Sequence, residues 1–394
     1  MRQVVVTAAR RTPIGKFMGA FLDAPAPVLG ATAVRAALAS ARVDPAQVDE
    51  VVFGHARLAG TGPNPARQVV RGAGLPDAVP AFTVNKACGS GLKAIVLAAQ
   101  SIRLGEARVV VAGGMENMSR VPYLLDRARS GYRLGNGVLL DAMYQDGFLD
   151  PLSGAVMGET AETLAARDHI SRGEQDAFAV ASQERAARAW EAGRFAAEIV
   201  AVTVRDSAGR EATVERDEHP RAGTTVEKLS KLPPVFRADG SVTAGNSSGI
   251  TDGAAALVLM EEEYARAHGH PILARLGAHA QVGVDPAIMG IGPVPALRRV
   301  FEATGLGLGD FDLFEINEAF AAQVLSCLRA LPIDPDRLNV NGGAIALGHP
   351  IGASGARIVT TLVHELQRRE ARRGIASLCI SGGQGMALVV ERVA

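Results

Sequence analysis

The sequence predicts an α/β fold built from two similar halves. Short β-branched runs alternate with helical stretches rich in Ala and Leu, as in residues 48–56, 91–107 and 108–118, and this alternation is typical of buried strands joined by helices. A pattern at 87–119 recurs at 347–390: a loop, a helix that starts among small residues, and a strand that ends in a pair of glycines. Two such halves packed together would bring their equivalent ends to one shared cleft.

Composition excludes several classes of function. The 394 residues, 48% of them hydrophobic, are enough for a large core and more than one packed unit. Lys+Arg and Asp+Glu are balanced at 41 each, so no overall field attracts nucleic acid or an anionic membrane surface. The amino terminus lacks the pattern of a signal peptide, and no stretch approaches the roughly 18 apolar residues of a membrane span. We therefore expect a cytoplasmic protein with neither a nucleic-acid partner nor a membrane partner.

Residues 119–246 differ from the rest of the chain. Gly, Pro, Asp and Tyr are frequent in their first part, and charged amphipathic helices follow. We expect this region to be an insertion into the first half. Within it, Ser171 and Glu174 stand at capping-box spacing and Gly193 follows, which predicts a helix of about five turns. Its charged face is expected to be solvated surface.

Cys88 occupies an unusual place, between the end of an expected strand and the start of an expected helix. Unpaired N–H groups and the helix dipole favour an anion there, and such surroundings lower the pKa of a thiol. Gly89, Ser90 and Gly91 allow another group to approach the sulfur closely. The position alone leaves two interpretations open, a nucleophile or a small cysteine that only packs.

A thiolate nucleophile needs a base, and His349 stands out because glycine-rich sequence surrounds it on both sides. His219 lies in a polar turn and is expected at the surface, whereas His55 follows a strand and stays a candidate. The glycine-rich run lacks both GxGxxG and a terminal GK[ST], so it favours nucleotide binding only weakly. Cys379 ends a clear strand and is a third candidate, while Cys327 has helical spacing and is expected in the core. No CxxC pair or disulfide framework is present, and we expect no metal.

Four motifs resemble, in order and spacing, the signature regions of the thiolase family: VNKACGSGLKA at 84–94, NEAFAAQ at 317–323, NGGAIALGHPIGASGAR at 341–357 and CISGGQGMALVVE at 379–391. The resemblance covers essentially the whole chain. It implies the thiolase fold, with two similar halves in a five-layered αβαβα arrangement and a loop domain inserted in the first half. We therefore expect an N-terminal half at 1–270, with a loop domain that binds CoA at 119–246, and a C-terminal half at 271–394.

The resemblance implies an acyltransferase that condenses two acetyl-CoA to acetoacetyl-CoA and CoA, or cleaves 3-ketoacyl-CoA, by a ping-pong route through an acyl-cysteine. Cys88 would be the nucleophile and His349 its base. Cys379 would remove the weakly acidic α-proton of the second acetyl-CoA, which needs a base in a dry pocket and donors for the enolate oxygen. Asn317 would position a water for that enolate, with His349 as the other donor. Backbone N–H groups of Cys88 and near Ser381 would bind the acyl oxyanion, although relatives often carry Gly at the latter position.

Residues that contact CoA follow from the same resemblance. Arg221 matches a position suited to the adenine or phosphate end, Ser248 matches a pantetheine contact, and Met157 would line the pantetheine tunnel. Val156 departs from the His of many biosynthetic members, which leaves the acyl-chain length open. Lys228 stands where relatives carry a Ser that contacts the nucleotide.

Coenzyme A and acetyl-CoA are implied as substrates, without a tightly bound cofactor, and the implied assembly is a homotetramer built as a dimer of dimers. Two alternatives stay open. Ketoacyl synthases share the fold and a cysteine nucleophile, but they typically use two histidines, which the Cys379 and GHP motifs argue against. A catalytically silent relative would only bind acyl-CoA, which the full set of candidate catalytic residues argues against.

Overall fold

The computed structural model describes residues 2–205 and 209–393. Within them, ten strands form one sheet in the order β12-β13-β14-β11-β1-β10-β5-β3-β4, and β2 (Gly15–Lys16) pairs with β10. The strands of the first half are β1 (Val4–Arg11), β3 (Glu50–Gly54), β4 (Ala81–Val84), β5 (Val109–Asn117) and β10 (Thr251–Glu261). The strands of the second half are β11 (Ala274–Gly283), β12 (Leu313–Ile316), β13 (Arg373–Ile380) and β14 (Gln384–Arg392). The halves are joined where Val5 and Val6 of β1 pair with β11.

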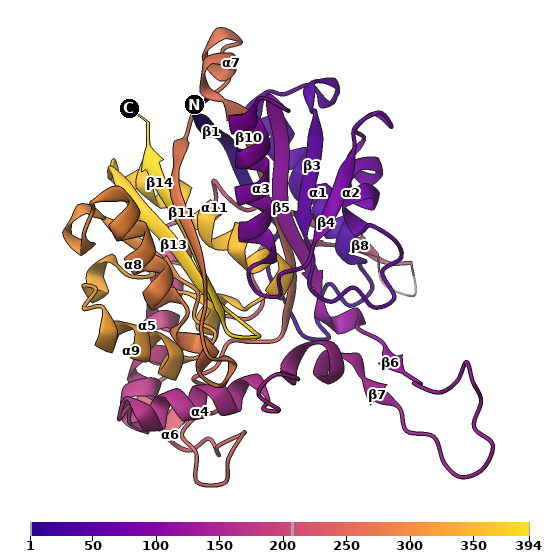
Figure 1. The fold of residues 1–394 in the computed structure, drawn as a ribbon, viewed down its shortest axis with the longest axis vertical. Helices are drawn as coiled ribbons and strands as arrows, with labels where there is room; N and C mark the ends of the chain where they lie inside the picture. The colour runs from indigo at the N-terminus through magenta and orange to yellow at the C-terminus, as the bar shows by residue number, and fades with distance from the viewer. Residues whose placement is uncertain (1, 206–208, 394) are drawn as a thin grey trace.

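Helices cover both faces of each half, which produces five layers (Figure 1). The outer helices of the first half are α1 (Ala26–Ala41) and α2 (Pro65–Ala73), which share an apolar core with the first sheet. The outer helices of the second half are α8 (Pro293–Thr304) and α9 (Ala321–Ala330). Between the strands of the two halves lie α3 (Ser90–Leu104) and α11 (Ile351–Arg369), whose apolar side chains form the central core with strands of both halves. The predicted five-layered arrangement is therefore confirmed.

Equivalent strands of the halves pair in the same way. The β3–β5 pair is parallel, while the β5–β10 and β10–β1 pairs are antiparallel. The β12–β13 pair is likewise parallel, while the β13–β14 and β14–β11 pairs are antiparallel. The internal repeat seen in the sequence is thus a repeat of structure.

The repeat fails at the paired glycines. The prediction that both strands end there holds for β13, where Gly382 and Gly383 form a turn with φ of 79° and 75°. It is wrong for β5, which runs through Gly113 and Gly114 as far as Asn117. Pairing with β3 on one side and β10 on the other continues at Gly114, and this two-sided ladder keeps the glycine extended.

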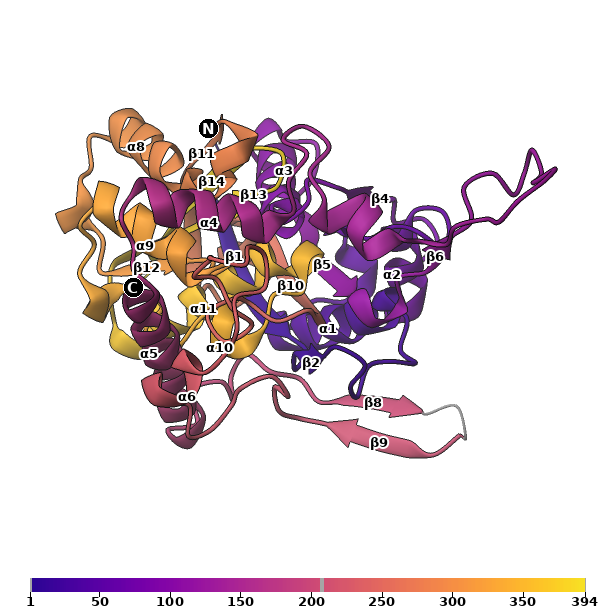
Figure 2. The ribbon, with the colours of Figure 1, turned by 90° about the horizontal axis from the view of Figure 1, so that it is seen from below.

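The chain leaves the first sheet after Asn117 and returns to it at Thr251. Two thin hairpins project from this region in Figures 1 and 2, and they consist of β6 (Tyr123–Leu124) with β7 (Leu140–Asp141) and β8 (Val202–Arg205) with β9 (Glu211–Val214). Its helices are α4 (Met157–Arg167), α5 (Arg172–Glu191) and α6 (Val226–Ser230), with a π-helical turn at Tyr144–Phe148. The predicted helix is confirmed as α5, where Ser171 and Glu174 form the capping box.

Short elements complete the described part of the chain: α7 (Glu262–Ala267), α10 (Ala344–Leu347) and 3₁₀ turns at Pro45–Gln47, Met118–Arg120, Pro286–Ile291, Leu308–Asp310 and Pro335–Arg337. The central helices approach closely because glycines face each other's backbone. A Cβ on Gly355 of α11 would collide with Leu92 of α3. None of the helices described here is both long and apolar enough to cross a bilayer.

Candidate active site

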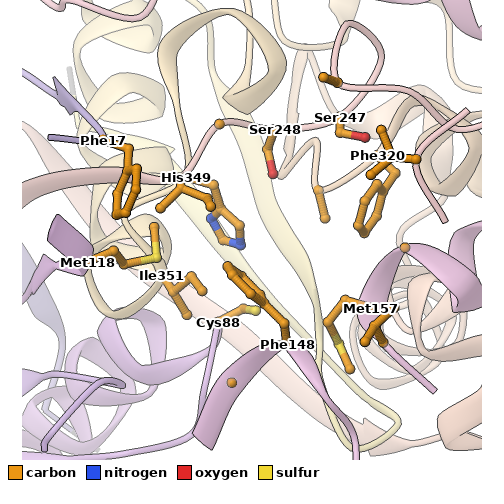
Figure 3. Close-up of a pocket in the computed structure, with 18 of the residues that line it drawn as sticks. Phe17, Cys88, Met118, Phe148, Met157, Ser247, Ser248, Phe320, His349 and Ile351 are labelled. Carbon is orange, nitrogen blue, oxygen red and sulfur yellow. The ribbon is translucent and has the colours of Figure 1, made fainter. Parts of the chain in front are cut away.

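The two halves present their special residues at equivalent positions. Cys88 lies two residues before the first residue of α3, and His349 lies two residues before the first residue of α11. Because α3 and α11 pack together between the sheets, both side chains reach one cavity of about 530 Å³. In Figure 3 the imidazole ring of His349 and the sulfur of Cys88 point into the same space. The shared cleft expected from the repeat is present.

The lining of this cavity is mostly apolar and includes several polar groups. Apolar lining comes from Phe17, Met118, Phe148, Val156, Met157, Phe236, Phe320 and Ile351. Polar lining comes from Lys16, Arg57, His219, Arg221, Ser247 and Ser248. Such a composition suits a ligand with a long apolar or weakly polar arm and a charged end.

The loop that carries Cys88 is held in a constrained conformation. Ala87 has a φ of 45°, a left-handed conformation that non-glycine residues seldom adopt. The side chain of Ser90 stabilises it, because its hydroxyl donates to the carbonyl of Ala87 at 2.6 Å and accepts from the N–H of Lys86 at 2.8 Å. Such strain is often found at functional sites. It turns the half-buried Cys88 into the cavity.

The thiol of Cys88 does not have the lowered pKa that the sequence suggested. Burial raises the pKa of Cys88, while the backbone N–H of Ser381 and the charge of Arg57 act in the opposite direction. The prediction is wrong because loss of hydration outweighs the donors at the start of the helix. Cys88 is a neutral thiol at neutral pH and needs a base to become a nucleophile.

The hydrogen bonds around His349 favour the tautomer that a base needs. Its Nδ1 lies 2.5 Å from Ser354 Oγ, and that hydroxyl donates its proton to the carbonyl of Pro350 at 3.0 Å. With its proton used in that bond, Ser354 Oγ accepts from an Nδ1–H, and this assignment leaves the lone pair on Nε2. Nε2 has no hydrogen-bond partner among the described residues. Burial, with the charges of Arg357 and Arg57, lowers the pKa of His349 to about 3, so the ring is neutral at physiological pH.

Cys379 does not line the cavity but packs against residues that do. It is fully buried near the end of β13 and packs with Met157, Phe320 and other residues of one apolar cluster. Burial raises the pKa of Cys379 well above its usual value, and the nearby Cys88 thiol adds to the rise. Cys327 lies elsewhere, buried in α9 with its pKa raised by burial to about 12. It is a core residue, as predicted.

Asn317 follows β12 and is completely buried. Neither its amide oxygen nor its amide nitrogen has a hydrogen-bond partner among the described residues. A buried amide without partners is costly, and a bound water or ligand atom is its usual complement.

The next residue, Glu318, accepts hydrogen bonds from Ser182, Asn339 and the N–H of Ile345 at 2.7, 2.9 and 3.2 Å. Sequence reasoning missed this carboxylate, which ties the loop of Asn317 to the glycine-rich loop before His349.

The three candidate CoA contacts, Arg221, Ser248 and Met157, all line the cavity, as does Val156. Lys228 is not among the lining residues, and its ammonium donates to the carbonyl of Gly223 at 2.7 Å.

The expectation that His219 is a surface residue is wrong. It is half-buried and lines the cavity, and its Nδ1 lies 3.0 Å from the carbonyl of Ala346. Its polar sequence neighbours predicted an exposed turn, but the turn folds back over the glycine-rich loop. Burial lowers the pKa of His219.

His55, the remaining histidine candidate, pairs with a buried carboxylate. Its Nε2 lies 3.1 Å from Glu116 Oε1, and both side chains are completely buried. Glu116 also accepts backbone N–H bonds from Ala56, Arg57 and Gly352 at 3.2, 3.1 and 2.9 Å. This pair joins β3, β5 and α11 beneath the cavity, and neither residue lines it. No sequence signal identified Glu116 or the pocket-lining Arg57.

Comparisons with known proteins agree with this architecture. The family model described as "Thiolase, N-terminal domain" matches residues 4–263, and "Thiolase, C-terminal domain" matches residues 270–392. The chain is 55% identical over 392 residues to an acetyl-CoA acetyltransferase of Pseudomonas aeruginosa and 52% identical over 394 residues to one of Escherichia coli K12, with 100% of both chains covered.

Solved structures are equally similar. A crystal structure of the Bacillus anthracis acetyl-CoA acetyltransferase matches with a TM-score of 0.98 and 47% identity, covering 100% of this chain and 99% of that one. A crystal structure of human mitochondrial 3-ketoacyl-CoA thiolase matches with a TM-score of 0.96 and 44% identity, at the same coverage. Within residues 2–205 and 209–393, no group of three or more His, Cys, Asp or Glu is placed to hold a metal.

Proposed function

The chain belongs to the thiolase family, and we propose that it is an acetyl-CoA C-acetyltransferase that condenses two acetyl-CoA to acetoacetyl-CoA and CoA and also runs in reverse. One observation carries the proposal: the thiol of Cys88 and the free Nε2 of His349 share one cavity, and Cys379 packs directly behind its lining residues Met157 and Phe320. Full-length relatives named acetyl-CoA acetyltransferase support the choice of substrate. A thiol and an imidazole suffice for acyl transfer, so coenzyme A acts as substrate and no tightly bound cofactor is needed.

In the first half-reaction His349 Nε2 takes the proton of Cys88 and the thiolate attacks the thioester carbon. The oxyanion that forms is stabilised by N–H groups of Cys88 and Ser381. This assignment is supported by the backbone N–H of Ser381, which lies near enough to the sulfur to act on the pKa of Cys88. The intermediate collapses with loss of CoA, which takes a proton from Cys379 and leaves. Cys88 is then acetylated, His349 is protonated and Cys379 is a thiolate.

In the second half-reaction the Cys379 thiolate removes the α-proton of a second acetyl-CoA. A thiol whose pKa is raised by burial is a strong base once it is ionised. Protonated His349 and a water held by Asn317 donate to the enolate oxygen, and the two unpartnered amide atoms of Asn317 support this role. The enolate carbon attacks the acetyl group on Cys88, acetoacetyl-CoA leaves, and the Cys88 thiolate recovers its proton from His349.

Coenzyme A is proposed to enter along the inserted region. Arg221 is exposed at the cavity and suits the phosphates or the adenine end. Ser248 and Met157 lie along the same cavity and suit the amides and methylenes of pantetheine.

A homotetramer, a dimer of dimers, is the proposed assembly. The β6–β7 hairpin carries several large apolar side chains that are exposed in the single chain, and they comprise Tyr123, Leu125, Leu134, Val138 and Leu139. An exposed apolar patch of this kind usually marks a contact with another protein chain.

Cytoplasmic location is proposed because the three cysteines are unpaired thiols, which suits a reducing compartment.

Thiolysis tests the proposed function directly. Purified protein with acetoacetyl-CoA and free CoA should form acetyl-CoA, measured as loss of enolate absorbance and by chromatography of the products. A silent acyl-CoA binder would bind acetoacetyl-CoA without turnover. A ketoacyl synthase would instead condense malonyl thioesters with release of CO₂, so a malonyl-CoA reaction without thiolysis contradicts the proposal.

A further inference from the structure

Arg57 makes three successive contacts with one turn of the cavity wall. Its Nη1 donates to the carbonyl of Asp146 at 3.2 Å, and its Cζ lies 5.8 Å from the ring centroid of Phe148. Between these residues, a Cβ on Gly147 would overlap the guanidinium group. One side chain therefore grips the π-helical turn Tyr144–Phe148 by a hydrogen bond, close packing and a cation–π contact.

The base of this side chain is fixed to the core. The backbone N–H of Arg57 donates to Glu116, the buried carboxylate that also binds Ala56 and Gly352. The Arg57 side chain is only 5% exposed, and its Nε has no hydrogen-bond partner among the described residues. Burying an incompletely bonded guanidinium costs stability. The contacts of Arg57 with the Tyr144–Phe148 turn offset this loss of stability.

The turn in question supplies one wall around the nucleophile. Phe148 packs in one apolar cluster with Cys88, Met118 and Ile351, and Figure 3 shows its ring beside the Cys88 sulfur. Phe148 therefore bounds part of the space open to an acyl group on that sulfur. Met118 and Ile351 belong to buried elements, whereas Phe148 is carried by a turn whose first residue, Tyr144, is 56% exposed.

We propose that Arg57 is a specificity-determining positioning residue: it clamps the Tyr144–Phe148 turn so that Phe148 closes the acyl side of the cavity and the enzyme favours short acyl groups. This inference rests on the proposed thiolase activity. Without the clamp the turn moves outward, the wall recedes and longer 3-oxoacyl chains fit. A hydrophobic wall that excludes a few methylene groups can favour the short substrate over the longer one by about tenfold or more in kcat/KM.

Thiolysis of acetoacetyl-CoA and of 3-oxooctanoyl-CoA by matched variants tests the clamp. Arg57→Met keeps an apolar stem of similar length and removes the charge and the hydrogen bond. We expect the ratio of kcat/KM, acetoacetyl-CoA over 3-oxooctanoyl-CoA, to fall about tenfold, with most of the change in KM. Arg57→Lys keeps the charge without the planar group and should show the same direction. Phe148→Ala should produce the largest fall, because it removes the wall itself.

Gly147→Ala tests the same contact from the other side. Its new Cβ pushes the guanidinium away while Arg57 stays intact, so the ratio should fall as in Arg57→Met. The double variant should fall no further, because both changes break one interaction. Hydrogen exchange of residues 144–148 should be faster in each single variant. Circular dichroism would reveal whether Arg57→Met folds poorly. In that case Gly147→Ala still tests the contact, because Arg57 itself is unchanged.

Three results would overturn the clamp. One is an unchanged substrate ratio in Arg57→Met and Gly147→Ala. Another is an equal loss of kcat/KM with both substrates in Arg57→Met, together with slower alkylation of Cys88 by iodoacetamide at neutral pH. Arg57 would then act through its charge on the thiol and not through the turn. The third is unchanged hydrogen exchange of the turn. Absence of thiolysis in the wild-type enzyme would instead refute the proposed function, which keeps the two failures distinct.

Discussion

The two halves of the molecule place different chemistry at the same position. Cys88 before α3 and His349 before α11 occupy equivalent joints of a repeated scaffold. Their surroundings differ: apart from Ser90 in its first turn, the buried residues of α3 are glycine or apolar, whereas α11 buries Ser354, Arg357 and Glu365 along its length. The buried serine orients the imidazole. The repeat therefore determines where the reactive groups meet, and the neighbours of each helix determine what each group does.

The connections after the equivalent strands differ as well. After β13 a tight turn through Gly382 and Gly383 leads directly to β14, and it leaves the N–H of Ser381 directed at Cys88. After β5 the chain makes the long excursion that ends at Thr251. That excursion supplies Met157, Arg221 and most of the remaining cavity wall. One half thus contributes a compact set of proton-transfer groups, and the other contributes the nucleophile and the binding wall.

Replacement of the nucleophile has the largest expected effect. Cys88→Ala should lower kcat by at least about 10⁴-fold, because covalent catalysis loses its acceptor. Removing a half-buried sulfur from a loop should change the melting temperature by only a few degrees. Steady-state thiolysis and thermal unfolding measure the two effects. Cys327→Ala, a buried thiol outside the cavity, is the matched control and should retain turnover. Iodoacetamide should label Cys88 first. Preferential labelling of Cys327 would show that Cys88 is not the reactive thiol.

Cys379→Ser should separate the two half-reactions. Acyl transfer to Cys88 requires no α-proton removal, so mass spectrometry should find an acetyl group on Cys88 after incubation with acetyl-CoA. Condensation should slow by about 10²- to 10⁴-fold, because a serine hydroxyl is a far weaker acid and base than a thiol. Condensation near the wild-type rate would show that Cys379 is not the second base.

Ser354→Ala sharpens the comparison between α3 and α11. Without the hydroxyl that accepts from Nδ1, the ring of His349 loses its fixed tautomer and orientation, and kcat/KM should fall by about 10²-fold. Ser377→Ala removes another buried hydroxyl, one that donates to the carbonyl of Met386, and serves as the control. Equal losses in both variants would indicate a packing defect, and the orienting role would then be wrong.

The pH dependence of thiolysis tests the neutral state of His349. Its pKa is lowered to about 3 by burial, so the ring is a neutral base at every pH above about 4. We therefore expect kcat/KM to show no loss near pH 6.5, the ordinary range of histidine. Arg57→Met removes a nearby positive charge and should raise the pKa of His349. A wild-type acid limb centred near pH 6.5 would contradict the assignment.

Glu315 gives the smallest effect, one on stability alone. Burial raises its pKa to about 8 beside Arg357, so the folded protein holds a proton that the unfolded chain releases near pH 4.3. The stability from that proton is complete below about pH 4 and is lost as pH rises to 8. Relative to wild type, Glu315→Gln should gain at least about 2 kcal/mol of unfolding free energy between pH 5 and pH 8.5. Parallel pH curves from urea unfolding would contradict this.

Much of the fold and of the candidate site could be predicted from local patterns. The fold class and the thiolase family are confirmed by the family models, full-length relatives and solved structures. Acetyl-CoA acetyltransferase is the printed name of the relatives and stays the proposed activity of this chain. The roles of Cys88, His349, Cys379 and Asn317 stay predictions: Cys88 and His349 line one cavity, whereas Cys379 and Asn317 are completely buried and are not among its lining residues. Their motifs were readable because small residues at helix starts and glycine-rich turns are short-range features.

The sequence by itself determined the alternation of strands and helices, the repeat and the motif residues, because these depend on neighbours along the chain. Only the tertiary structure decided the raised pKa of Cys88, the tautomer of His349 and the place of His219 in the cavity. It also decided that β5 continues through the same pair of glycines that ends the equivalent strand. Burial and hydrogen-bond partners come from segments distant in sequence: Ser381 reaches Cys88 from the other half, and Arg57 reaches Phe148 across the cavity wall. Pairings of this kind leave no periodic trace in the chain, since long-range packing creates them.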